Sequence, residues 1–187
     1  MYDGHPKSPL ILSHPIGCAR KYISYRNYGD EQAKFYCGRS AGKGEPGYME
    51  EPLRVSALRS GLIMVSDKKQ NCIHLFNVET NEGNVGASFL RKIGADGGDP
   101  MVSPDAICED HLRNIIVCEK KRISVYSKAG AKICDLLVEE STEWRSPRAV
   151  AFNRHRRLLA VAHTGVSNSD GFNVHDFISV YNTNPQN

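Results

Sequence analysis

A pattern that recurs three times along the chain constrains its fold more than any other feature of the sequence. Each copy has a bulky residue three positions before a proline, an apolar residue three positions after it, and an ionisable residue 15 or 16 positions after it. The prolines are Pro52, Pro104 and Pro147, separated by 52 and then 43 residues. Periods of this length are typical of folds that repeat one supersecondary unit. The sequence therefore predicts a tandem array of similar units.

Each unit is predicted to consist of β-strands. Its apolar runs are short, rich in Val, Ile, Leu and Tyr, and separated by Gly, Asn, Asp and Ser. In the first full unit we expect strand A after Pro52, strand B at 63–66, strand C at 73–76 and strand D at 89–93. The proline opens strand A, where its missing N–H removes no ladder hydrogen bond.

A single sheet of four strands cannot cover both of its faces. Stacking such sheets around a common axis buries the faces against one another, which is the β-propeller solution. The predicted fold class is therefore all-β, a β-propeller with four-stranded antiparallel blades. The bulky residues before the prolines, Met49, Met101 and Trp144, are interpreted as wedges between neighbouring blades.

The chain is too short for a complete ring of such blades. Six blades of about 43 residues would need roughly 260 residues, and the chain has 187. We expect an irregular segment at 1–21 and an open, partial propeller over 22–187. Its expected blades are a part blade at 22–48, whole blades at 49–100 and 101–143, and an incomplete blade at 144–182. Either the chain is a fragment, or it self-associates to complete the ring.

The landmarks resemble the NHL repeat over about residues 22–182. The motifs are the segment from Gly42 to Met49 that leads to Pro52, the strands IMVSD and IIVCE, and the strands IHLFN and ISVYS. The third copy departs from the pattern, with His163 at the acidic position and a polar insertion at 165–176. The best-known relatives are TRIM-NHL proteins, cytoplasmic ubiquitin ligases and post-transcriptional regulators, whose propellers bind RNA or proteins.

The resemblance implies a non-catalytic interaction module that acts in the cytoplasm and needs no cofactor. Ligase activity is not expected on this chain, because it lacks RING, B-box and coiled-coil segments. The expected partners are RNA or an acidic protein surface, and other proteins.

Basic residues recur at two kinds of place that an up-and-down blade brings to one face. The B–C connections and the starts of strand A carry the candidate ligand-binding residues, which are Lys68, Lys69, Lys120, Lys121, Arg122, Arg148 and Arg54. A polyanion or an acidic partner would suit this face, whereas a simple solvated surface is the alternative. The segment 154–157 is also basic, but it occupies an A–B turn on the opposite face.

A catalytic alternative is a lyase or lactonase propeller with a metal in the central channel. His74, His111 and His163 lack metal-ligand spacing, so no metal site and no catalytic residue is predicted. Asp67 and Glu119 occupy equivalent positions and are expected to cap their own B–C turns rather than to form a catalytic pair. The G-x-G-x-x-G match at 42–47 contains a proline and is interpreted as a loop between blades.

Six cysteines lack the spacing of a zinc site. Their even number would suit a secreted protein, but the sequence has no N-x-S/T glycosylation site, and they are expected to be free, buried thiols in a reducing compartment. The first residues contain no apolar core of a signal peptide. No apolar run approaches the roughly 18 residues of a membrane-spanning helix, so no membrane contact is expected. The net charge of +3 permits a polyanionic partner without requiring one.

Overall fold

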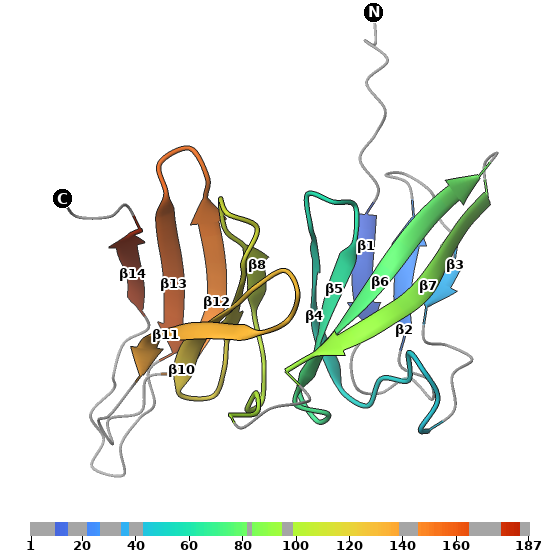
Figure 1. Ribbon diagram of the computed structural model, residues 1–187, viewed down its shortest axis with the longest axis horizontal. Helices are drawn as coiled ribbons and strands as arrows, with labels where there is room; N and C mark the ends of the chain where they lie inside the picture. The colour runs from blue at the N-terminus through green and yellow to red at the C-terminus, as the bar shows by residue number, and fades with distance from the viewer. Residues whose placement is uncertain are drawn as a thin grey trace, which may run out of the picture.

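The computed structural model of the protein describes residues 10–14, 22–26, 35–37, 43–81, 84–94, 99–138, 146–164 and 177–183. This part of the chain forms fourteen strands in four antiparallel sheets (Figure 1). It contains no helix that is long and apolar enough to cross a membrane. The all-β fold predicted from the repeat is confirmed.

The strands follow one another in chain order within each sheet. Sheet 1 contains β1 (Leu10–His14), β2 (Tyr22–Arg26) and β3 (Phe35–Cys37). Sheet 2 contains β4 (Pro52–Ala57), β5 (Ile63–Asp67), β6 (Cys72–Asn81) and β7 (Asn84–Ile93). Sheet 3 contains β8 (Ile107–Glu109), β9 (Ile115–Cys118), β10 (Arg122–Tyr126) and β11 (Lys132–Val138). Sheet 4 contains β12 (Ser146–Asn153), β13 (Leu158–Thr164) and β14 (Phe177–Asn182).

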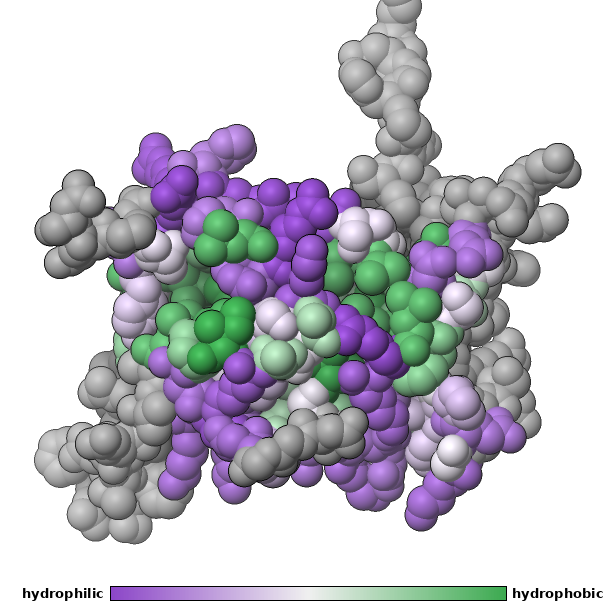
Figure 2. All heavy atoms as spheres, viewed as in Figure 1, coloured by the Kyte–Doolittle hydropathy of each residue, from purple (hydrophilic) through white to green (hydrophobic). Residues whose placement is uncertain are grey.

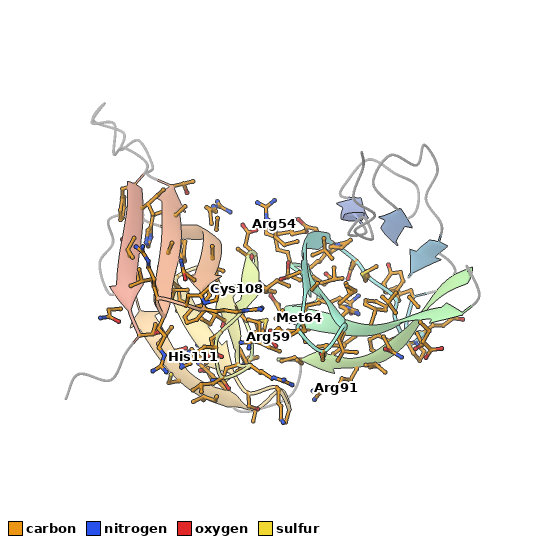
Figure 3. All side chains as sticks on the ribbon, turned by 90° about the horizontal axis from the view of Figure 1, so that it is seen from above. Arg54, Arg59, Met64, Arg91, Cys108 and His111 are labelled. Carbon is orange, nitrogen blue, oxygen red and sulfur yellow. The ribbon has the colours of Figure 1, made fainter. Side chains whose placement is uncertain are left out.

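The sheets are arranged as propeller blades. The first strands of successive sheets contact one another, from β1 to β4, from β4 to β8 and from β8 to β12, and on the outside β3 contacts β7. Figure 3, seen along the inner strands, places Arg54 on the side of the inner strands and Arg91 on the outer side. All three landmark prolines are buried at or just before an inner strand, as the repeat predicts.

The core is divided into layers between the blades. One cluster joins sheets 2 and 3 and includes Met64, Ile73, Met101, Ile115 and Tyr126. A second cluster joins sheets 3 and 4 and includes Ile116, Ile123, Leu159 and Val161. Because each layer takes side chains from two sheets, neighbouring blades shield one another's apolar faces.

Met101 packs between neighbouring blades as predicted, whereas Met49 is buried against its own blade. Met49 packs in a third cluster with Ile63, Val65 and Phe76 of sheet 2. Met101 lies in the layer between sheets 2 and 3. Trp144, the third predicted wedge, lies outside the described residues.

Some boundaries differ from the expected ones. The segment 1–21 was expected to be irregular, yet strand β1 lies within it. Strands β6 and β7 form a hairpin of ten residues each, longer than the expected runs at 73–76 and 89–93. Pro104 precedes β8 rather than opening it, although the Asp105 N–H already donates to the Cys118 carbonyl at 2.8 Å and extends the ladder.

Candidate functional site

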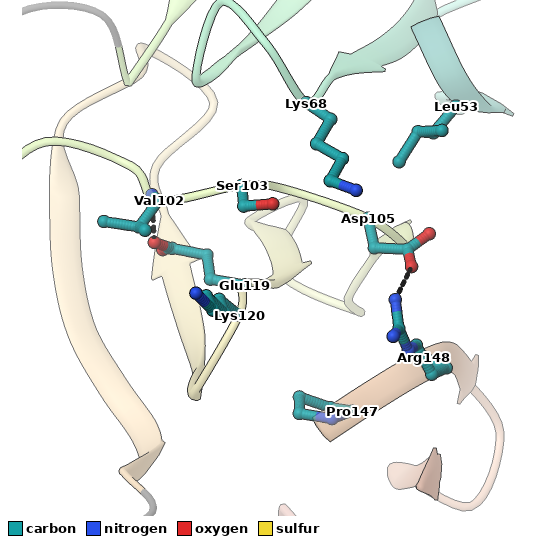
Figure 4. Close-up of a pocket in the computed structure, with 9 residues that line it drawn as sticks. All are labelled: Leu53, Lys68, Val102, Ser103, Asp105, Glu119, Lys120, Pro147 and Arg148. Carbon is teal, nitrogen blue, oxygen red and sulfur yellow. Dashed lines mark hydrogen bonds and ion pairs between the residues drawn. The ribbon is translucent and has the colours of Figure 1, made fainter. Parts of the chain in front are cut away.

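A pocket of about 370 Å³ opens where sheets 2, 3 and 4 meet at the beginnings of their inner strands. We call it the axial pocket; its lining residues are Leu53, Lys68, Val102, Ser103, Asp105, Glu119, Lys120, Pro147 and Arg148 (Figure 4). Its volume lies in the range of small-molecule sites, roughly 300–1,000 Å³. The B–C and D–A connections therefore share one face, as the blade topology predicts.

The repeat itself builds this pocket. Leu53, Asp105 and Arg148 each follow a landmark proline, so one position of the repeat contributes a side chain from each of three blades. Lys68 and Lys120 are likewise equivalent, each following the ionisable residue at the end of strand B. Their backbone N–H groups donate to the D–A connections, Lys68 to the Glu51 carbonyl at 3.0 Å and Lys120 to the Val102 carbonyl at 3.1 Å.

Two arginines from different blades hold one carboxylate at the side of the pocket. Arg54 Nε lies 3.2 Å from Asp105 Oδ1, and Arg148 Nη1 lies 3.4 Å from Asp105 Oδ2 (Figure 4 shows the second contact). The Asp105 side chain is 13% exposed, whereas those of Arg54 and Arg148 are 58% and 54% exposed. The carboxylate thus orients two guanidinium groups that remain open to solvent.

The buried carboxylates at the ends of the B strands have a structural role. Asp67 accepts hydrogen bonds from the backbone N–H groups of Glu50, Glu51, Lys69 and Gln70, at 2.5 to 3.2 Å. It therefore caps its B–C turn, as predicted, and also ties down the preceding D–A connection.

Glu119 likewise anchors the D–A connection of its blade, in sheet 3. It accepts from the Val102 N–H at 2.7 Å, from Tyr126 Oη at 3.2 Å and from Arg122 Nε at 3.0 Å. Burial raises the pKa of Tyr126 well above its ordinary value, and the neighbouring Glu119 carboxylate adds to the rise. The paired-carboxylate interpretation of Asp67 and Glu119 is not supported, because both carboxylates are already occupied by these donors.

The predicted basic residues separate into two groups. Arg54, Lys68, Lys120 and Arg148 lie in or beside the axial pocket. The other three, Lys69, Lys121 and Arg122, are not among its lining residues. Lys69 pairs with Glu50 at 2.6 Å, Arg122 pairs with Asp99 and Glu119, and Lys121 is exposed.

A similar clamp occurs on the opposite face, at the ends of the inner strands. Glu109 Oε2 accepts from Arg59 Nε at 3.3 Å and from Arg154 Nη2 at 3.1 Å, so this carboxylate of sheet 3 also joins both neighbouring blades. Arg154 comes from the basic A–B turn at 154–157, which lies on this face as predicted. The arginine in that turn nearest the sheet is thus a link between blades.

A metal ion fits poorly at the axial pocket, because its two lining carboxylates already accept from arginine guanidinium groups. Among the residues that the structure describes, no group of three or more His, Cys, Asp and Glu side chains is placed to hold a metal. His74 is fully buried 3.7 Å from Asp67, and burial lowers its pKa to about 4. His111 stacks on Phe152 and His163 on Phe177, so the three histidines do not converge.

Cys72, Cys108, Cys118 and Cys134 are free thiols. Burial raises the pKa values of Cys72, Cys108 and Cys118 to about 12, which makes them poor nucleophiles at neutral pH. Cys134 is exposed, so the expectation that every cysteine is buried is wrong for this residue.

Asp105 is the site residue that sequence reasoning missed. It follows Pro104 as Arg148 follows Pro147, and Arg148 was singled out only because it is basic. Comparing the same repeat position across the three blades, regardless of residue type, would have found it. Equivalent positions of adjacent blades lie around a common axis, so they are the natural lining of a shared pocket.

No protein-family model matches the chain, and no curated protein is similar to it in sequence. Solved structures with a similar fold exist. A candidate gluconolactonase has a TM-score of 0.62 at 15% identity over 95% of this chain and 56% of that protein. A catalytically inactive virginiamycin B lyase from Staphylococcus aureus, solved with quinupristin, has a TM-score of 0.51 at 13% identity over 93% of this chain and 60% of that protein.

These similarities support the β-propeller fold but not the finer assignment to TRIM-NHL proteins. The chain spans little more than half the length of these two propellers. The expectation that the chain is not an enzyme is corrected, because these neighbours are propellers of the lactonase and lyase kinds. Absence of a catalytic sequence motif was a weak reason for that expectation, since a propeller site is assembled from single residues of several blades.

Proposed function

We propose that the chain forms part of a β-propeller enzyme of the lactonase or lyase type whose substrate binds in the axial pocket. The observation that carries the proposal is the convergence of one repeat position from three blades on a single pocket. A chain that used its blades only for stacking would not need the charged side chains of Asp105 and Arg148 at this position. The similarity in fold to lactonase-type and lyase propellers agrees with this proposal.

The pocket's charges suit a reaction in which negative charge develops on oxygen. In lactone hydrolysis water adds to the ring carbonyl and gives an oxyanion, the ring C–O bond then breaks, and a hydroxy acid is released that loses its proton to become a carboxylate. In a lyase, removal of a proton beside a carbonyl gives an enolate before the leaving group departs. Fixed donors such as Arg148 and Lys68 stabilise either species better than they stabilise the neutral substrate.

The proposal is tested by measuring acid release from D-glucono-δ-lactone in a pH-stat and the conversion of quinupristin by chromatography with mass detection. The wild-type chain is expected to act on at least one of them, and Arg148→Gln is expected to lower kcat/KM by about 100-fold. Arg156→Gln is the matched control, because Arg156 is exposed in the A–B turn on the opposite face. Rates that never exceed the spontaneous reaction for either compound would remove the proposal.

RNA or an acidic protein surface is a second proposal for the same face. It is carried by the exposed neighbours Lys120 and Lys121 in the B–C connection of sheet 3. If they contact phosphates, Lys120→Glu with Lys121→Glu weakens binding equally for all RNA sequences and flattens its salt dependence. Filter binding over a salt series measures both effects, and unchanged affinity and slope would exclude this role.

A further inference from the structure

We infer that the axial pocket takes an anionic ligand, a carboxylate or a phosphate, and that the arginines oriented by Asp105 bind it without a bridging divalent cation. This inference rests on the proposed function, since it names the chemical class of the substrate or product. It goes beyond that function by assigning the charge of the ligand and the groups that recognise it.

The first step concerns the donors that the arginines still have. A guanidinium group has five N–H donors in a fixed plane. Arg54 gives its Nε–H to Asp105, and Arg148 gives one N–H to Asp105 and one, over 3.4 Å, to Thr164 Oγ1. Both side chains are more than half exposed, so their remaining donors are accessible to a solute, and Arg148 is part of the pocket lining.

The second step concerns orientation. A long arginine side chain on a surface samples many rotamers, and fixing it on binding costs free energy. Here Asp105, which is mostly buried, holds one arginine with each carboxylate oxygen. Part of the ordering is therefore complete before the ligand arrives, which favours recognition of a planar carboxylate or a phosphate by paired N–H groups.

The third step concerns the charge of the whole pocket. Its lining includes three cationic side chains, Lys68, Lys120 and Arg148, and two carboxylates, Asp105 and Glu119. Glu119 faces Arg122 at 2.9 Å, and Asp105 faces Arg54 from outside the lining as well as Arg148. Each carboxylate is thus engaged by a guanidinium group. The lining itself, with three cationic side chains and two carboxylates, carries one net positive charge, although Lys68 also lies 3.8 Å from Glu51 outside the lining.

The fourth step compares an anion with a cation. A divalent metal would need several unengaged oxygen or nitrogen ligands and would be repelled by the arginines and lysines. An anion meets favourable charge and open donors at once. The same pocket that fits a metal poorly therefore fits the carboxylate of a ring-opened lactone.

The test is isothermal titration of the whole chain with two probes, D-gluconate for a carboxylate and inorganic phosphate for a phosphate, in buffer containing EDTA. We expect saturable binding of at least one probe with one site per chain. Arg148→Gln should weaken it about ten- to a hundredfold, because a charge-assisted hydrogen bond is lost. Arg156→Gln should leave the affinity unchanged, and circular dichroism reports whether each variant is folded.

Lys68→Gln is the second variant, because this exposed side chain has no part in the clamp and its loss is not expected to affect folding. It should weaken binding by a few-fold. The inference is overturned if neither probe binds, if binding appears only after Ca²⁺ or Mn²⁺ replaces EDTA, or if Arg148→Gln and Lys68→Gln bind as the wild type does. Anion binding without any lactone or quinupristin turnover would instead refute the proposed reaction and leave the assignment of the pocket standing.

Discussion

Truncating Met101 to alanine tests the packing between blades. The Met101 side chain is 1% exposed and belongs to the cluster that joins sheets 2 and 3. It lies directly over Gly94, where an added Cβ would come within 2.6 Å of the methionine Cε. Gly94 also has a φ of +79°, so the backbone turns sharply beneath the side chain. Met101 therefore fills space between two blades.

The magnitude follows from this burial. Removal of a buried methionine side chain costs about 2–5 kcal/mol, and we take about 3 kcal/mol because both walls of the site are sheets that relax little. With a urea m-value of about 2 kcal/mol per molar, the midpoint of urea unfolding should fall by about 1.5 M with no change in m. Val102→Ala is the matched control, since its side chain is 46% exposed, and should change stability by less than about 0.5 kcal/mol.

The result that refutes this reasoning is a Met101→Ala protein whose urea midpoint moves no more than that of Val102→Ala. Such a result would mean that the layer between the two sheets is not a close-packed core, and that the blades are stabilised separately. A large change in m would mean that the variant unfolds in more than one step.

Three further predictions concern other parts of the molecule. Asp67→Ala should lower the free energy of unfolding by about 3 kcal/mol, because partly buried backbone N–H groups lose their acceptor. Asp99→Ala removes only the solvent-exposed pairing of Asp99 with Arg122 and Lys132, so it should lower the urea midpoint much less. Equal effects of the two variants in urea titrations would contradict the capping role of Asp67. Burial lowers the pKa of His74 to about 4 from an ordinary 6.5, so between these pH values the unfolded state binds a proton that the folded state does not, and the free energy of unfolding falls by up to about 3 kcal/mol as the pH drops from 6.5 to 4. His74→Phe should lose that part of the pH dependence when urea midpoints are measured across this range. An unchanged dependence of the midpoint on pH would contradict the burial of His74. Ile178, which is 71% exposed on β14 of sheet 4, is proposed to pack against a second copy of the chain. Light scattering should show that the wild type forms an oligomer and that Ile178→Asp dissociates it, and a monomeric wild type would rule out this contact.

The exposed apolar side chains give the last of these predictions its basis. Ile178 and Val180 are 71% and 60% exposed on β14, and Leu90, Ile133 and Leu136 are exposed on the outer strands β7 and β11. Figure 2 shows apolar patches on the molecular face over these outer strands, on either side of a hydrophilic band. Ile178 and Val180 lie two residues apart on the same edge strand, which makes β14 the place where we expect a contact with a second copy.

The sequence predicted the fold because the same physical demand recurs in every blade. Each blade needs a residue that can open an inner strand, an apolar side chain that fills the layer beside it, and an acceptor for the N–H groups of the B–C turn. Pro52, Met101 and Asp67 do these three things in the structure. Such needs are local in sequence, so their spacing can be read without a structure.

The site could be predicted only in part, because its contacts join residues far apart along the chain. That Lys68 and Arg148 share a face followed from topology. The bond between Arg54 and Asp105 spans 51 residues and depends on the angle between two blades, which no spacing encodes. The same is true of the links of Arg59 and Arg154 to Glu109 on the opposite face.

A crystal structure of the chain grown with excess D-gluconate tests the central claim most directly. The account predicts consecutive four-stranded blades around one axis, with the gluconate carboxylate in the axial pocket against Arg148 and Lys68, and with Asp105 between Arg54 and Arg148. Gluconate bound away from this pocket, or inner strands that do not converge on it, would contradict the account.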